Sequence, residues 1–359
     1  FLPLSLSIVS LLLFFFFLKG ISHFPSIIFG FFLLSINIYH IKYSVEIRSY
    51  ILTFLLTILF FILNFENKKL ANINFLRLIG ILLISILLVF NHSFTLLIIL
   101  SLIIFKFLHF YKNSNYKLFD IILLIGLILI GLFYVFIYLP YNIQFIGTEF
   151  FNSESGSPHW MKPLKLSFFT NFYFSQYFGS RILGLIHLVT LLYLIVRFKK
   201  YLLSELNIYS FFVILIIVTY LIPIIYNFLF GPVLLGRYII FLIIPIISLI
   251  SFLTFKILNK KLKFFLIFII SFPTMINHVL YENSFKQFYT DIYPTKPQIH
   301  EALKFINLSD TKTFLLLDNK AKEKNAFLAY KNYIFTYKKK LKYNLNYIKP
   351  DVQGTLSKS

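Results

Sequence analysis

Ten long apolar stretches dominate this chain, and short polar connections separate them. Most of the stretches run for roughly 15 to 22 residues, and about 20 apolar residues in an α-helix cross the hydrocarbon core of a bilayer. The sequence therefore predicts an all-α polytopic membrane protein with about 10 transmembrane helices. We expect these helices over residues 1–18, 24–41, 51–64, 76–91, 93–110, 118–139, 181–197, 208–228, 238–255 and 263–280.

The composition excludes a soluble globular protein. The chain is 59% hydrophobic and 13% charged, whereas soluble domains carry about 25% charged residues. The mean hydropathy is +0.83. The formal net charge of +21 comes from bases spread over helix ends and the tail. These bases form no aromatic–basic patch of the kind that nucleic-acid-binding modules present, so we expect no nucleic-acid partner. The lack of cysteine excludes disulfides and thiolate metal sites.

Lysine and arginine fall preferentially on every second connection, which predicts an orientation. The base-rich set of connections holds Lys19, Lys68, Lys69, Arg77, Lys106, Lys112, Lys117, Arg197, Lys199, Lys200, Lys256, Lys260, Lys261 and Lys263. The other set holds Lys42, Arg48, Lys162, Lys165, Arg181 and Arg237. Base-rich connections of membrane proteins lie in the cytoplasm. We therefore expect a multi-pass protein of the inner (plasma) membrane, with loops 42–50, 140–180 and 229–237 and the C-terminal segment outside.

The sequence becomes polar after the last apolar stretch, so we assign the transmembrane domain to residues 1–280. In the segment 281–337, Pro297 favours the start of a helix, and residues 313–317 have the pattern of a short buried strand. We expect a small, outward-facing α/β segment there. Residues 338–359 are rich in lysine and offer little to bury, which predicts a flexible basic tail.

The segment HIKYSVEIRSY, residues 40–50, is the most informative for function. It places Glu46 and Arg48 at the outer end of the second predicted helix. Ionisable residues near the bilayer are costly and usually face a polar cavity or each other. A purely anchoring role, with Tyr43 and Tyr50 in an aromatic belt, is the structural alternative.

Four motifs resemble those of the GT-C glycosyltransferase superfamily, in the group related to protein O-mannosyltransferases and the lipid A aminoarabinose transferase (family 39-like). YSVEIRSY resembles the signature YS-x-E-x-R-x-Y, and FLPLSLSIVSLLLFFFFLK resembles the R-x-P-S helix, without its arginine. VFNHSFTLLIIL, which contains His92, resembles the T-H-Y-F junction. GRYIIFLIIPIISLIS, which contains Arg237 and Tyr238, resembles the R-Y-x-x-x-x-x-P helix. The four occur in the family's order over about residues 1–281.

This resemblance implies an outward-facing, inverting transferase. It would move a sugar from a polyprenyl-phosphate-linked donor to a cell-envelope glycan, lipid or protein. It implies substrate-binding roles for Glu46, Arg48, Tyr50, His92, Trp160, Arg237 and Tyr238. The catalytic acid of the family lies in its first outer loop. We expect that loop and the first helix to lie upstream of Phe1, so the catalytic residue is unknown and no residue of this chain is assigned as the base.

The chemistry of phosphate binding singles out the two arginines. A sugar that leaves a lipid phosphate generates a phosphate leaving group, which a guanidinium binds bidentately where lysine offers a point charge. Arg48 and Arg237 are the candidates, although an interfacial arginine that snorkels to the headgroups is the alternative for Arg237. His92 either binds phosphate or acceptor or is a hydrogen-bonded histidine at a helix junction. Glu46 is a second acid or a structural partner of Arg48.

The predicted outer loop 140–180 contains the single tryptophan of the chain. Trp160 either contacts the sugar or anchors the loop at the interface. Glu149, Glu154 and His159 have a spacing that fits no metal site, so a divalent metal is possible but unsupported and no cofactor is established.

Two other functions remain open. An O-antigen polymerase or ligase would carry an arginine cluster in its large outer loop, whereas 140–180 has only lysines until Arg181. A transporter or flippase would show charged or broken helices at mid-membrane. Most of the predicted helices have no charge at their centres.

Overall fold

The computed structural model describes residues 2–46, 48–113, 117–138, 164–229 and 232–279. The chain divides into two units, Phe1–Asp291 and Ile292–Ser359, and all the described residues belong to the first unit. Trp160, the expected α/β segment 281–337 and the expected tail 338–359 lie outside the described residues.

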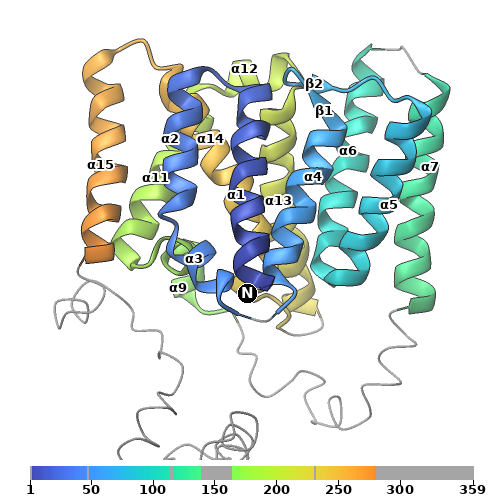
Figure 1. The fold of residues 1–359 in the computed structure, drawn as a ribbon, viewed down its shortest axis with the longest axis horizontal. Helices are drawn as coiled ribbons and strands as arrows, with labels where there is room; N and C mark the ends of the chain where they lie inside the picture. Colours follow the sequence, from blue (N-terminus) through green and yellow to red (C-terminus); the bar gives the residue numbers. More distant parts are fainter. Residues whose placement is uncertain (1, 47, 114–116, 139–163, 230–231, 280–359) are drawn as a thin grey trace, which may run out of the picture. The chain divides into compact units, whose positions relative to one another are not determined.

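The described part is helical apart from one small hairpin (Figure 1). The long helices are α1 (Leu2–Ile21), α2 (Phe24–Ser35), α4 (Tyr50–Asn64), α5 (Phe75–Asn91), α6 (Leu96–Asn113), α7 (Leu118–Phe133), α11 (Arg181–Arg197), α13 (Ile208–Leu229), α14 (Ile243–Phe255) and α15 (Lys260–Val279). The short elements are α3 (Ile38–Ser44), η1 (Ser93–Thr95), η2 (Tyr134–Tyr138), α9 (Leu166–Asn171), α10 (Phe174–Phe178), α12 (Lys199–Ser204) and η3 (Gly236–Leu242). The hairpin is β1 (Phe65–Glu66) with β2 (Lys69–Leu70).

Each of the predicted apolar stretches forms a helix, and the prediction of an all-α membrane protein is confirmed at that level. Among the described residues, five helices are long and apolar enough to cross a membrane, or six if the bent pair α2–α3 is one span. The five are Leu2–Ile21, Ser93–Lys112, Leu118–Tyr138, Ile208–Leu229 and Gly236–Phe255. α4 and α5 are shorter apolar helices.

The long helices lie side by side and alternate in direction, so their connections gather at two ends (Figure 1). One end carries the β hairpin, α12 and the connections with the larger set of bases; we call it the base-rich end. The other carries α3, η1, α9, α10 and η3; we call it the site end. The sequence pattern of alternating connections therefore corresponds to two ends of one bundle.

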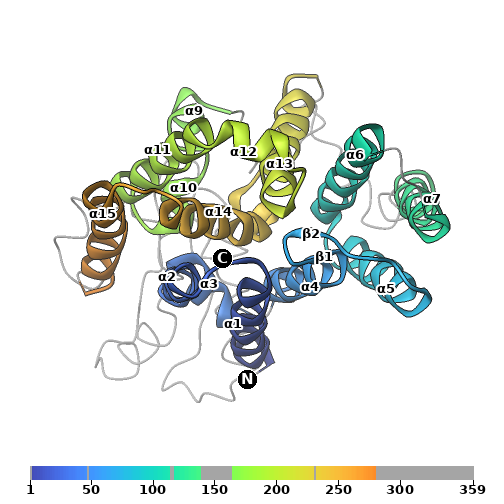
Figure 2. The same ribbon diagram turned by 90° about the horizontal axis from the view of Figure 1, so that it is seen from above.

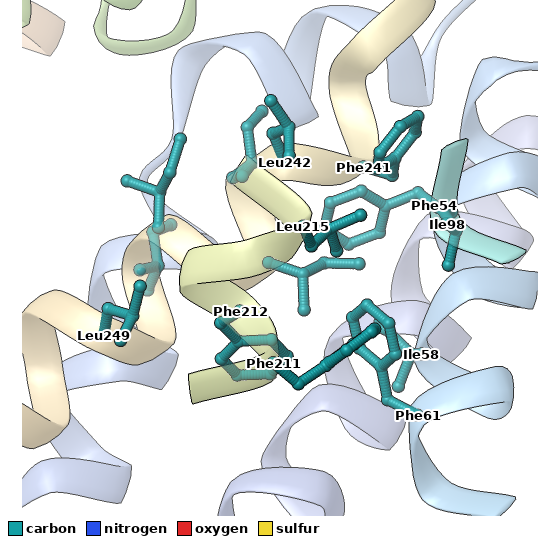
Figure 3. Close-up of a cluster of buried hydrophobic side chains, with 14 of the residues drawn as sticks. Phe54, Ile58, Phe61, Ile98, Phe211, Phe212, Leu215, Phe241, Leu242 and Leu249 are labelled. Atoms are coloured by element: carbon teal, nitrogen blue, oxygen red, sulfur yellow. The ribbon is translucent and has the colours of Figure 1, made fainter. Parts of the chain in front are cut away.

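α14 lies in the middle of the bundle, where it packs against α2, α11 and α13 (Figure 2). Every residue from 243 to 254 is buried, because this helix is apolar on all sides. Phenylalanines fill the space between α4 and α13: Phe61 contacts Phe211 and Phe212, with ring centroids 5.6 and 5.3 Å apart (Figure 3).

The single helix predicted over 24–41 is wrong in one respect, because the structure breaks it into α2 and α3 with a bend of 54°. Asn37 causes the break. Its side chain accepts a hydrogen bond from the backbone N–H of His40 at 2.9 Å and donates to the carbonyl of Tyr177 at 3.0 Å. An asparagine in this role begins a new helix rather than continuing the old one.

Two other predicted helices change geometry at the site end. The one predicted over 118–139 finishes as the π-helical turn η2, and the one over 238–255 starts as the 3-10 helix η3. Pro245 explains the second change. A proline lacks the N–H that would bond the carbonyl of Phe241, and its ring would clash with that carbonyl, so Pro245 favours a position in the first turn of α14.

The hairpin was not predicted. Asn67 and Lys68 join its strands with φ values of 46° and 70°, which are the positive values that a two-residue type I′ turn requires. The carbonyl of Lys68 accepts a hydrogen bond from Ile208 N–H at 2.8 Å. This bond ties the turn to the start of α13.

Candidate functional site

A continuous series of ring contacts crosses the site end of the bundle. Tyr39 contacts Tyr43 with ring centroids 4.8 Å apart, and Tyr43 contacts Tyr50 at 4.9 Å. Tyr50 contacts His92 at 5.7 Å, and His92 contacts Tyr238 at 5.3 Å. α3, the start of α4, the α5–α6 junction and η3 each contribute to this series. Three regions that are distant in sequence, namely α3 with the start of α4, the α5–α6 junction and η3, therefore meet at one place.

Hydrogen bonds fix the α5–α6 junction against the start of α4. The side-chain amide of Asn91 donates to the carbonyl of Ser49 at 3.1 Å and to the hydroxyl of Thr53 at 2.7 Å. His92 caps the next turn: its Nδ1 accepts from Phe94 N–H at 3.4 Å. These contacts hold the imidazole in place and leave its Nε2 edge for other partners, since Nδ1 faces its own backbone.

α10 positions η3, which carries Arg237 and Tyr238. The Tyr177 hydroxyl donates to the carbonyl of Gly236 at 3.3 Å, and the Tyr177 ring lies 5.2 Å from that of Tyr39. A Cβ atom on Gly236 would lie 2.2 Å from Oε1 of Gln176. A larger residue at position 236 would therefore require the Gln176 side chain to move where η3 approaches α10, immediately before Arg237.

Two arginines and one acid of the predicted site lie at this end. Glu46 is buried, and its Oε2 lies 3.6 Å from Nε of Arg48, whose side chain is 52% exposed. The guanidinium carbon of Arg237 lies 5.5 Å from the centroid of the Tyr238 ring. Arg48 is therefore paired with the carboxylate of Glu46 and is still exposed enough to bind a ligand. Arg237 lies over the ring of Tyr238, a contact that suits a planar guanidinium.

The electrostatic environment keeps His92 neutral. Burial and, to a smaller extent, the nearby positive charge of Arg237 together lower the pKa of the imidazole to about 4. Desolvation disfavours the charged form of histidine, and so does a like charge close by. At pH 7 His92 is a neutral hydrogen-bonding group.

Six of the seven predicted site residues lie in the described part, and the structure gathers them at the site end. Tyr50, His92 and Tyr238 are members of the ring series, Arg237 lies over Tyr238, and Glu46 pairs with Arg48. Trp160 lies outside the described residues. The substrate-binding roles of these residues stay a prediction.

The sequence interpretation missed a buried polar group beside the ring series. Nε2 of His40 lies 3.2 Å from the hydroxyl of Ser10 and 3.4 Å from that of Ser7. The spacing of Ser7 and Ser10, three residues apart on an apolar helix, is the sequence signal that places both hydroxyls on one face.

Within the described ranges, no group of three or more His, Asp or Glu side chains is placed to hold a metal ion. No protein-family model, curated protein or solved structure matches this chain. The residues of the site end and their geometry therefore carry the functional proposal.

Proposed function

We propose that this protein is an integral membrane glycosyltransferase. It moves a sugar from a polyprenyl-phosphate-linked donor to a cell-envelope glycan, lipid or protein, with inversion at the transferred carbon. The convergence of Tyr50, His92, Arg237 and Tyr238 from three separate segments supports this proposal most strongly. These side chains lie in three of the four sequence motifs.

The arginines bind the phosphate of the donor. When the bond between the sugar and the phosphate oxygen breaks, the electron pair stays on the phosphate. Charge-assisted hydrogen bonds from a guanidinium stabilise that developing charge. Glu46, 3.6 Å from Arg48, orients one guanidinium, and the face of Tyr238 supports the other.

The aromatic residues and His92 bind the sugar. Tyrosine rings offer an apolar face for the C–H surface of a pyranose and a hydroxyl for its polar edge. A neutral imidazole accepts or donates one hydrogen bond without placing a second full charge beside Arg237. Tyr50 and Tyr238 both contact His92, so the sugar is proposed to bind against this group of three side chains.

In this proposal about 10 helices cross the inner membrane and the site end faces outward, because the base-rich end stays in the cytoplasm. The chain has no cysteine, so single cysteines report topology cleanly. Val45 at the site end is 71% exposed, and Lys200 lies in α12 at the base-rich end. An impermeant maleimide added to intact cells should label Val45→Cys and spare Lys200→Cys. The reverse pattern would overturn the orientation.

Transfer itself is tested with the full-length protein in proteoliposomes and a panel of radiolabelled polyprenyl-phosphate sugars. Arg237→Lys should slow release of polyprenyl phosphate by about 100-fold, the usual cost of removing one oriented charge-stabilising donor, and Arg48→Lys should slow it less. Arg181→Lys is the matched control, an exposed arginine at the start of α11, and should stay within about twofold. Full turnover by Arg237→Lys contradicts the phosphate role, and the failure of the wild-type protein on every donor contradicts the function.

A further inference from the structure

Two lysines share one aromatic ring at the base-rich end. Nζ of Lys68, in the hairpin turn, lies 5.1 Å from the centroid of Phe252, and Nζ of Lys256 lies 5.5 Å from the same centroid. Lys256 also lies 3.0 Å from the centroid of Tyr201 in α12. All three distances are within the range of about 6 Å over which an ammonium is attracted by a ring face.

Beside this lysine pair, a buried tyrosine stacks on Phe252 and forms hydrogen bonds to a neighbouring helix end. Tyr209 stacks on Phe252 with centroids 3.8 Å apart and an interplanar angle of 7°. The Tyr209 hydroxyl donates to the carbonyl of Ile21 at 2.6 Å and lies 2.8 Å from the hydroxyl of Ser22. The ends of α1 and α14 and the start of α13 are thereby joined beneath the two lysines.

The backbone at Lys68 is unusual for a lysine. It occupies the second central position of the type I′ turn with a φ of 70°, where glycine is strongly preferred because a Cβ atom is disfavoured there. The bond from Ile208 N–H to the Lys68 carbonyl holds the turn in place.

The charges around the pair leave an excess of positive potential. In the described part of the chain neither Lys68 nor Lys256 has an ion pair, whereas Arg77 pairs with Glu66 and Lys106 pairs with Asp120. Desolvation lowers the pKa of Lys256, the carboxylate of the exposed Glu205 opposes this shift, and the charge of Lys68 adds to it by a smaller amount. An anion between the two ammoniums would relieve their repulsion.

Apolar side chains flank the lysines on the surface. Leu258, two residues after Lys256, is 94% exposed, and Leu203, two residues after Tyr201, is 74% exposed. Phe24, next to His23, is also exposed; the His23 ring itself lies 6.4 Å from that of Phe252. Lysines beside exposed apolar residues at a helix end are the pattern of a surface that contacts lipid headgroups and acyl chains together.

We propose that Lys68 and Lys256, with Tyr201 and Phe252, bind the phosphate of an anionic membrane lipid at the base-rich end. A lipid headgroup and a soluble phosphate compound could both place a phosphate between the two ammoniums. The exposed leucines favour the lipid. This site lies at the end of the bundle opposite the proposed transfer site, and it does not depend on the glycosyltransferase proposal.

The test uses the full-length protein, delipidated in detergent and titrated with phosphatidylglycerol or phosphatidylcholine, with bound lipid counted by native mass spectrometry. Phosphatidylglycerol should bind more tightly than phosphatidylcholine. Lys68→Gln and Lys256→Gln should each weaken it about fivefold, from the usual contribution of one lysine near an anionic surface. Lys69→Gln removes the same charge one residue along the hairpin and should change binding less than twofold. Lys256→Arg, which keeps the positive charge, should still bind phosphatidylglycerol as the wild-type protein does.

Three results would overturn the site. Equal weakening by Lys69→Gln would indicate diffuse attraction, and equal binding of phosphatidylcholine would show that the phosphate charge is not recognised. Displacement of the lipid by millimolar inorganic phosphate would assign the site to a soluble phosphate compound instead. The thermal unfolding midpoint of each variant without added lipid separates loss of binding from loss of the fold.

Discussion

The two ends of the bundle connect successive helices in different ways. At the base-rich end the helices are joined by regular devices, such as the two-residue turn at Asn67 and the cap at Asn207, whose side chain accepts from Tyr209 N–H at 2.9 Å. At the site end the backbone departs from regular helices. α2 bends by 54° into α3, and Phe172 and Tyr173 have positive φ values of 47° and 62°.

Side chains satisfy the irregular backbone of the site end. The Tyr220 hydroxyl donates to the carbonyl of Phe172 at 2.7 Å, and the Tyr173 hydroxyl donates to the carbonyl of Leu234 at 2.8 Å. In a membrane, a backbone group that leaves the helical pattern must find such a partner. Strained and irregular backbone is commonly found at functional sites. Positive φ values occur at both ends, because Asn67 and Lys68 also have them. The bend between α2 and α3 and the non-α turns η2 and η3 are what distinguish the site end, and they favour this end for chemistry.

The largest expected effect on stability concerns the ion pairs of the base-rich end. Nζ of Lys106 lies 2.9 Å from Oδ1 of Asp120, and the lysine side chain is 0% exposed. Asp120→Asn leaves a buried ammonium without its counter-charge and should lower the free energy of unfolding by about 3–5 kcal/mol. Glu66→Gln breaks the more exposed pair with Arg77 and should cost less than about 1 kcal/mol. Unfolding in detergent measures both, and equal costs would refute the assigned difference in burial.

Alanine substitutions at two glycines compare how tightly the two ends of the bundle are packed. A Cβ atom on Gly184, in the first turn of α11, would lie 2.4 Å from the backbone nitrogen of Ser175, whereas one on Gly20 would meet nothing within 4 Å. Gly184→Ala must push α10 away and should destabilise by about 1–3 kcal/mol. Gly20→Ala, at the base-rich end of α1, should be neutral or stabilise by up to about 1 kcal/mol. Similar unfolding midpoints for the two variants would contradict the close approach of α10 and α11.

The lowered pKa of His92 predicts a pH dependence of stability. Because the folded-state pKa is about 4, below the unfolded value of about 6.5, the unfolded chain binds more protons between these values. Stability is therefore lost as pH falls through this window. Between pH 7 and pH 5 the loss from His92 amounts to about 2 kcal/mol. Thermal unfolding of His92→Gln should lose correspondingly less over this interval, and an identical loss would mean that His92 is not held neutral.

The smallest effect concerns the hairpin turn. Lys68→Gly places the preferred residue at a φ of 70° and should raise the free energy of unfolding by up to about 1 kcal/mol. A higher unfolding midpoint together with weaker binding of phosphatidylglycerol would show that the position favours ligand binding over stability. A lower midpoint would show that the side chain of Lys68 is needed for the fold itself.

The sequence predicted the positions of the helices because long apolar runs need no tertiary information to be recognised. The break at Asn37 was not predictable in this way, since it depends on a bond to Tyr177, which lies 140 residues away in the chain. The sequence did not predict the hairpin, and the reason is local. Its turn has lysine where glycine is the usual signal, so the connection resembled any charged loop.

The candidate site was predicted in part. The motifs pointed to Tyr50, His92, Arg237 and Tyr238, which the structure brings together. Tyr177 was missed, although its hydroxyl positions η3. Nothing in its local sequence, an aromatic-rich stretch, separates it from the many tyrosines of this chain.

Photo-crosslinking tests the central claim most directly. A polyprenyl phosphate with a diazirine next to the phosphate would be irradiated with the full-length protein in bilayers that contain excess phosphatidylglycerol, and the labelled peptides mapped. We predict label on residues 43–50, 91–95 and 234–242, removed by unlabelled polyprenyl phosphate. Label confined to the base-rich end, on residues 64–70 and 199–207, or label that the competitor leaves unchanged, would contradict the assignment of sugar transfer to the site end.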